Sequence, residues 1–250
     1  MIKKVFSKFL VPILLTCLLI PAFSAHWPQS DEEAIIMLAP RLQMKVSELK
    51  QYLTLKKDND LIELVPLRDC QEHLDFVKNV RIYEDRTKQA EHMKYYYDGK
   101  TYTIERVEGR QLWRNQRMWG KDKTYTPTTP PLGLHFIVKV NGEIAAFLGS
   151  GPLTDIQNPL EVDYHVSQEF ANKGYSIFAI RQNLYINLLR RLKQKGIYKH
   201  DYFIATANVE HSHAQHLYSS LKNCEEQKDN FRYYGETEPK VKALVYYCYL

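Results

Sequence analysis

Apolar and polar residues alternate with two different periods along the chain, and each change of period marks an expected element. A helix is predicted from Asp31, because Ser30 can cap it and acidic residues fill its first turn. Pro40 stops or kinks this helix. Helical spacing then returns at residues 46–55, 69–85, 88–97 and 111–119.

Strand patterns separate these helical segments and dominate the middle of the chain. A short strand is expected at residues 61–65, and Asn141-Gly142 joins residues 134–140 to residues 144–148 as a hairpin turn. The next strand, residues 160–166, alternates polar with apolar residues. This alternation puts its polar set, Glu161, Asp163 and His165, on one face.

A long amphipathic helix is expected after that strand. Residues 176–195 place leucines and isoleucines on one stripe and end at Gly196, which suits a helix C-cap. A strand at residues 202–207, a helix at 212–221 and a final strand at 243–249 complete the pattern.

The first residues form a separate segment. Lys3, Lys4 and Lys8 precede an apolar run at residues 9–20, and small residues follow at 22–25, which is the pattern of a secretory signal peptide. We therefore expect export by the Sec route, to the periplasm or out of the cell, or a membrane anchor if the segment stays uncleaved. The predicted parts are a signal at 1–24, a helical extension at 25–60 and a main domain at 61–250.

Charge and cysteine content exclude some classes of function. Without the three signal lysines the formal net charge falls from +5 to +2, because 31 basic residues then face 29 acidic ones, so nucleic acid is not suggested as a partner. Three cysteines remain, without the spacing of a zinc site. Cys224 and Cys248 can form a disulfide, or all three cysteines can be buried thiols.

The turn between the strand at 160–166 and the long helix is the first candidate site. A helix N-terminus offers unpaired backbone N–H groups and a partial positive charge, and Gly174 would let a pyrophosphate approach them closely. A single glycine before a helix more often marks a plain turn.

The order of elements from residue 61 onward resembles the GNAT superfamily of acyl-CoA-dependent N-acetyltransferases. Residues 161–179 resemble the branch that acetylates ribosomal-protein N-termini, and residues 205–218 resemble the second motif of the superfamily. The resemblance implies an α/β (α+β) fold, with a mixed, mostly antiparallel central sheet flanked by helices.

The same resemblance implies which residues bind the acyl donor, acetyl-CoA. Its pantetheine arm would lie between two splayed strands, and its phosphates would meet the backbone of the turn. Carried over, the cofactor-binding residues are Tyr164, His165, Val166, Asn172, Lys173, Gly174, Tyr175, Ser176 and His211. Ala171, Asn172 and His211 depart from the residues usual in the superfamily.

Two residues carry the chemistry that the resemblance implies. Glu161 would accept the proton of the attacking amine, directly or through water, and Tyr218 would protonate the leaving thiolate. The alternatives are a charged residue on a solvated strand face for Glu161 and a core aromatic for Tyr218. The expected partner is an amine-bearing acceptor, either a protein or a small molecule.

Two further clusters invite a functional interpretation. The histidines at 211, 213 and 216 lack a third ligand on one helix face, so no metal is expected there. Trp113 and Trp119, with the neighbouring arginines, form either a substrate wall or a half-buried amphipathic helix. The sequence predicts an acetyltransferase of primary amines, with an exported, non-catalytic binding module of the same fold as the alternative.

Overall fold

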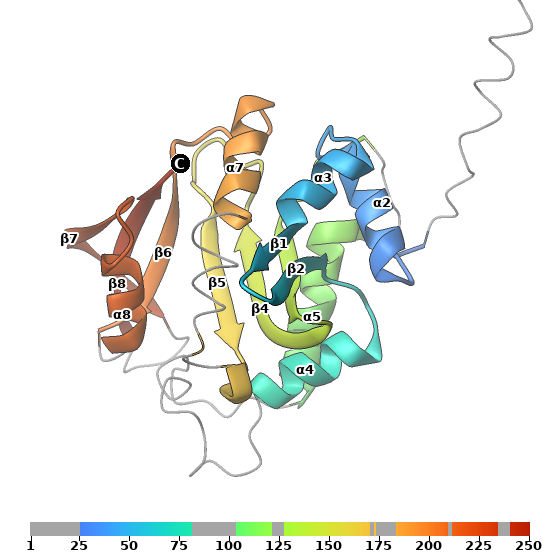
Figure 1. Cartoon of the computed structure of the whole chain (residues 1–250). Helices are drawn as coiled ribbons and strands as arrows, with labels where there is room; N and C mark the ends of the chain where they lie inside the picture. The colour runs from blue at the N-terminus through green and yellow to red at the C-terminus, as the bar shows by residue number, and fades with distance from the viewer. Residues whose placement is uncertain are drawn as a thin grey trace, which may run out of the picture.

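The computed structural model describes residues 26–81, 104–121, 128–170, 173, 184–209, 212–234 and 241–250. Its strands form one eight-stranded sheet in the order β1-β2-β3-β4-β5-β6-β8-β7 (Figure 1). All neighbouring strands are antiparallel except β5 and β6, which are parallel. The strands are β1 Thr54–Lys57, β2 Asp60–Pro66, β3 Leu134–Val140, β4 Glu143–Gly151, β5 Glu161–Val166, β6 Tyr202–Asn208, β7 Cys224–Tyr234 and β8 Val241–Tyr249.

Helices flank this sheet (Figure 1). The described helices are α2 Asp31–Arg41, α3 Val46–Leu53, α4 Gln71–Arg81, α5 Ile104–Trp119, α7 Tyr185–Gln194 and α8 Ser212–Ser219, with a short 3-10 turn, η4, at Gln168–Phe170. No helix in the described ranges combines the length and the apolar character that a membrane span needs. The mixed α/β architecture with a mostly antiparallel open sheet is the one that the sequence predicts.

Local signals in the sequence account for several element boundaries. The Ser30 hydroxyl caps α2 by accepting a hydrogen bond from the Glu33 backbone N–H at 3.1 Å. Pro40 lies one residue before the end of α2, as expected for a helix stop. Asn141 and Gly142 have φ angles of +53° and +86°, which a two-residue hairpin turn requires, so the predicted hairpin is confirmed.

Other expectations differ from the structure or lie outside it. Residues 54–57 form β1 and do not extend α3, and residues 224–234, for which the sequence predicts no element, form β7. The helix expected at 88–97 and the first part of the helix expected at 176–195 lie outside the described residues. Cys224 and Cys248 pair across β7 and β8 and form a disulfide, whereas Cys70 is a free thiol.

The register of the sheet assigns side chains to two faces. His135 pairs with Gly149, and Phe147 pairs with His165, so these residues share one face, which we call the pocket face. The opposite face carries Phe136, whose ring contacts that of Tyr185 on α7 with 6.4 Å between centroids. Arg114 of α5 lies over the Phe147 ring at 4.4 Å, so α5 covers the pocket face.

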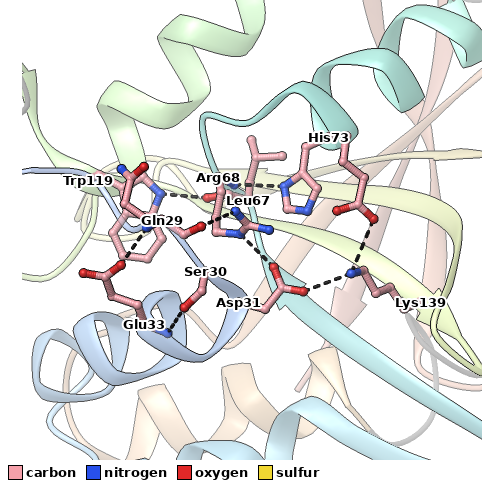
Figure 2. A network of polar contacts seen from close by, with 10 residues as sticks. Gln29, Ser30, Asp31, Glu33, Leu67, Arg68, His73, Trp119 and Lys139 are labelled. Carbon is pink, nitrogen blue, oxygen red and sulfur yellow. Dashed lines mark hydrogen bonds and ion pairs between the residues drawn. The ribbon is translucent and has the colours of Figure 1, made fainter.

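The residues that precede α2 are tied to the sheet by a polar network (Figure 2). Asp31 accepts hydrogen bonds from Arg68 Nε at 2.7 Å and from Lys139 Nζ at 2.9 Å. The His73 ring accepts the Arg68 backbone N–H at 3.1 Å, and Trp119 Nε1 donates to the Leu67 carbonyl at 2.7 Å. The network therefore holds α2 against β3 and against the segment that connects β2 to α4.

Candidate functional site

The parallel pair β5 and β6 diverges along its length. In the described part of the chain these strands pair through Glu161 with Ile204 and through Val162 with Ala205, and the ladder ends there. Strand β5 continues to Val166 and β6 to Asn208, each still paired with its other neighbour. Figure 1 shows the two strands separating toward their C-terminal ends. An extended chain entering this opening can add to the sheet through backbone hydrogen bonds.

A pocket of about 630 Å³ lies on the pocket face, beside the start of this opening. Its volume falls within the range of small-molecule sites. Helix α5 contributes one wall, and strands β3, β4 and β5 contribute the other. The lining residues are Arg110, Trp113, Arg114, Arg117, His135, Gly149, Ser150, Gly151, Pro152 and Glu161.

Two glycines at alternate positions of β4, Gly149 and Gly151, leave space in the pocket because they have no side chains. A Cβ added to Gly149 would lie 2.9 Å from His135 Nδ1 and 2.9 Å from the Phe147 ring. A Cβ added to Gly151 would lie 3.0 Å from Arg117 Nη2. Because any side chain at either position would displace a lining residue, the two glycines allow the arginine and the histidine to reach the strand.

The wall formed by α5 is polar even where it is buried. Gln111 and Asn115 are buried, and their side-chain amide groups have no hydrogen-bond partner among the described residues. Arg114 is also buried, over Phe147, while Trp113 is half-exposed. Of the three buried polar residues, Arg114 lines the pocket and the two amides lie beside it on α5, so the buried side of this helix carries polar groups next to the pocket.

Arg117 lies between the helix and the strand. Its guanidinium carbon lies 4.7 Å from the Trp113 ring centroid, and its Nη2 donates to the Leu132 carbonyl at 3.1 Å. Its Nε is buried and has no hydrogen-bond partner in the described part of the chain. Burial lowers the pKa of Arg117, but a guanidinium stays charged at neutral pH.

Glu161 lies where the strand pairing ends and the pocket begins. Its Oε1 accepts a hydrogen bond from Thr206 Oγ1 at 3.0 Å, and its Oε2 pairs with Arg232 Nη1 from β7. The carboxylate is partly exposed and lines the pocket. It can reach a ligand there, because each of its oxygens still has a lone pair that Thr206 and Arg232 do not use.

Tyr218 occupies a different environment. It is buried on α8, and its ring lies 5.3 Å from that of Tyr246, whose strand position pairs with Ala205 of β6. By register, Tyr246 lies on the face opposite Glu161. Glu161 and Tyr218 therefore approach the opening between β5 and β6 from opposite faces of the sheet, and the role of Tyr218 as an acid stays a prediction.

The predicted cofactor residues are described only in part. His165 is buried on β5, with its ring stacked 6.2 Å from that of Phe147, and Val166 is half-buried at the end of the same strand. The backbone of Tyr164 is in β5, and Lys173 is exposed, with its ammonium 5.0 Å from the Phe170 ring centroid. Asn172, Gly174, Tyr175, Ser176 and His211 lie outside the described residues.

Sequence reasoning missed Arg232 and His135, and it left the tryptophans undecided. Trp119 is a core residue bonded to Leu67, whereas Trp113 is half-exposed and lines the pocket, so a contact with substrate stays a prediction for Trp113. His135 has no sequence signal beyond its place in an apolar strand. Arg232 could have been found only by recognising β7 as a strand.

Cys70, Glu72 and His73 offer three donor atoms that lie within 4.8 Å of one another. Lys139 Nζ lies 3.6 Å from the Glu72 carboxylate, and Arg68 is adjacent to the His73 ring. The charges of Lys139 and Arg68 oppose a bound cation, so we assign no metal to this cluster.

Comparison with solved structures identifies proteins of similar architecture. Spermidine N-acetyltransferase from Vibrio cholerae, solved with CoA and spermine, has a TM-score of 0.50 and 15% identity, over 74% of this chain and 94% of that one. The acetyltransferase from Salmonella typhimurium that modifies the N-terminal serine of ribosomal protein L7/L12 has a TM-score of 0.51 and 11% identity, over 76% and 95%. A microcin C7 self-immunity acetyltransferase, solved with acetyl-CoA and AMP, has a TM-score of 0.51 and 11% identity, over 76% and 92%.

Sequence comparison adds nothing to this, because no protein-family model and no curated protein matches the chain. The structural likeness spans nearly the full length of each neighbour, and at such low identity it concerns the arrangement of the backbone. The mostly antiparallel sheet, its one parallel pair and the flanking helices give this chain the fold of the GNAT acetyltransferases.

Proposed function

We propose that this protein transfers the acetyl group of acetyl-CoA to a primary amine by direct attack of the amine on the thioester. The observation that carries the proposal is the end of the β5–β6 ladder after Val162 and Ala205, directly beside the pocket that Glu161 lines. An extended pantetheine arm can occupy that opening as an additional strand. The structural neighbours solved with CoA or acetyl-CoA support acetyl-CoA as the donor.

The chemistry requires a neutral amine and a proton for the departing sulfur. In the proposed mechanism the amine nitrogen attacks the thioester carbonyl, a tetrahedral intermediate forms, and the C–S bond then breaks. Glu161 takes the amine proton, directly or through water, at a lone pair that Thr206 and Arg232 do not use. Tyr218 donates its hydroxyl proton to the thiolate.

The engaged carboxylate also supports a second candidate function. Thr206 and Arg232 each contact one oxygen of Glu161, so the carboxylate also has a structural role that a protein without catalysis would keep. In that case the fold serves as a non-catalytic binding module. Loss of catalysis would leave the pocket and its ligand preference in place.

We also propose that the protein is exported. The basic and apolar pattern of the first 25 residues supports this, and so does the disulfide between Cys224 and Cys248, because disulfides persist in oxidising compartments. Export raises the question of the donor, since acetyl-CoA is a cytosolic metabolite. Delivery into another cell and activity before cleavage are two routes by which the protein would meet it.

The test combines binding with turnover. Calorimetric titration of the protein with acetyl-CoA is expected to give one site, and acetyl transfer to a panel of amines is then followed by release of free thiol. Glu161→Gln and Tyr218→Phe should each leave the acetyl-CoA affinity unchanged and lower kcat by about 100-fold or more. Glu63→Gln on β2 and Tyr52→Phe on α3 are the matched controls, because they make the same chemical changes away from the pocket.

Each outcome separates the candidates. Absence of acetyl-CoA binding at millimolar concentration would reject the acetyltransferase and leave the binding module. Binding without transfer to any amine would also favour the module. Full turnover in both substituted proteins would remove Glu161 and Tyr218 from the mechanism while leaving the activity established.

A further inference from the structure

The charged side chains among the described lining residues of the pocket are mostly cationic. Three of its lining side chains are guanidinium groups, all from α5: Arg110, Arg114 and Arg117. Among the lining residues that the structure describes, only Glu161 is acidic, and its carboxylate already pairs with Arg232. The α5 wall therefore presents a positive field to whatever enters.

The structure also shows features of a built site in addition to charge. Arg117 reaches the strand because Gly151 has no side chain, and Trp113 supports its guanidinium from the other side. Its buried Nε still has a hydrogen to donate, with no acceptor among the described residues. A planar guanidinium held in this way is suited to bind an oxyanion with two parallel hydrogen bonds.

We propose that the acceptor is a small anionic amine, in which a carboxylate or phosphate binds Arg117 and the other α5 arginines while the amine lies toward Glu161. This inference rests on the proposed function and names the substrate class of the same pocket. It argues against a polyamine acceptor, because several ammonium groups would face three guanidinium groups in one cavity. The volume of about 630 Å³ accommodates a metabolite with both groups.

Matched pairs of acceptors test the proposal, because they keep the amine and remove only the anion. Glycine is compared with glycinamide, O-phosphoethanolamine with ethanolamine, and spermidine serves as the cationic reference. We expect kcat/KM to be at least tenfold higher for the anionic member of one pair, and the responding pair tells a carboxylate from a phosphate. The amine of glycinamide is less basic than that of glycine, so a larger fraction of glycinamide is in the reactive neutral form. This difference favours glycinamide and therefore opposes the expected preference for glycine.

Substitution of Arg117 locates the effect. Arg117→Gln should lower kcat/KM at least tenfold for the preferred anionic amine and less than threefold for its neutral partner, whereas Arg117→Lys should retain an intermediate preference. Arg190→Gln is the control, because Arg190 is an exposed arginine on α7. Rising salt concentration should reduce the preference of the wild-type protein.

A second readout does not depend on acetyl transfer. The same ligands are titrated without acetyl-CoA, by calorimetry and by thermal shift, and the anionic members are again expected to bind at least tenfold more tightly. If acetyl-CoA fails to bind but the anionic preference persists, the proposed function fails and the preference of the pocket for anionic amines stands. Equal or better binding of the neutral amines or of spermidine would overturn the inference, and so would absence of binding by every anionic amine at tens of millimolar.

Discussion

Asp31 is the acid on which two cations of the N-terminal network depend. Its carboxylate lies 2.7 Å from Arg68 Nε and 2.9 Å from Lys139 Nζ, and the two basic side chains are only 10% and 13% exposed. Asp31→Asn removes the negative charge of the carboxylate, so Arg68 and Lys139 both lose this charged partner. Loss of one partner from a buried pair typically costs 3–5 kcal/mol, and because Asp31 is 32% exposed we expect a value of about 3 kcal/mol.

Glu32→Gln provides a matched control in the same helix turn. Glu32 lies next to Asp31 in the first turn of α2, so both substitutions remove one negative charge from the same helix N-terminus. Glu32 pairs with Lys50 at 2.9 Å, but these side chains are 58% and 45% exposed, and exposed pairs contribute roughly 0–1 kcal/mol. The difference between the two variants therefore measures the buried contacts.

Urea denaturation at pH 7 gives the free energy of unfolding of both variants. The same measurement over a series of pH values provides a second check. Burial by itself would raise the pKa of Asp31, but the hydrogen bonds and charges of Lys139 and Arg68 outweigh it and hold that pKa below the ordinary 3.8. The unfolded state then binds a proton more readily, so the stabilisation is complete above pH 5 and is lost as the pH falls through the folded pKa. Equal losses for Asp31→Asn and Glu32→Gln at pH 7, or a difference that does not shrink as the pH falls below 3.8, would refute the reasoning.

Three other predictions concern stability and the pocket floor. Burial, with the charge of Arg68, lowers the pKa of His73 from 6.5 to about 4, so the unfolded state gains a proton first as the pH falls. The wild-type protein should therefore lose about 2–3 kcal/mol of stability between pH 7 and pH 4.5 that His73→Gln does not lose, as urea midpoints at the two pH values would show. Cys248→Ala removes a cross-link spanning 24 residues and should cost about 3 kcal/mol in the same assay, with Cys70→Ala as the control that leaves the disulfide intact. Gly149→Ala places a Cβ 2.9 Å from His135 and Phe147 and should cost about 1–3 kcal/mol while weakening acceptor binding; unchanged calorimetric affinity and stability would contradict the close packing.

The sequence predicts the middle strands of this fold well because their signals are local. Asn141 and Gly142 have the positive φ angles of a tight hairpin turn, and Ser30 supplies a helix cap whose geometry needs no distant partner. Strand β7 was missed for the opposite reason. It is highly polar, and nothing within residues 224–234 indicates that β8 pairs with it.

The candidate site was predictable only as far as the resemblance reached. Glu161, which the resemblance singled out, lines the pocket, but its contacts with Thr206 and Arg232 join residues separated by 45 and 71 positions. The pocket itself depends on the absence of side chains at Gly149 and Gly151, which face α5 only because of the β3–β4 register. Pairings over such distances carry no periodic signal in a single sequence.

Strand β7 makes the environment of Glu161 depend on residues far from the pocket. The Cys224–Cys248 disulfide fixes the first residue of β7 to β8, and regular pairing stops after Glu226 and resumes at Phe231. Five steps along β7 then correspond to two along β8, from Tyr246 to Leu244, so the intervening residues bulge out of the ladder.

Arg232 follows directly after the bulge. A one-residue shift of the register after the bulge would move Arg232 to the other face of the sheet, away from Glu161. The contact between Arg232 and the carboxylate in the pocket therefore depends on the register that β7 takes after the bulge.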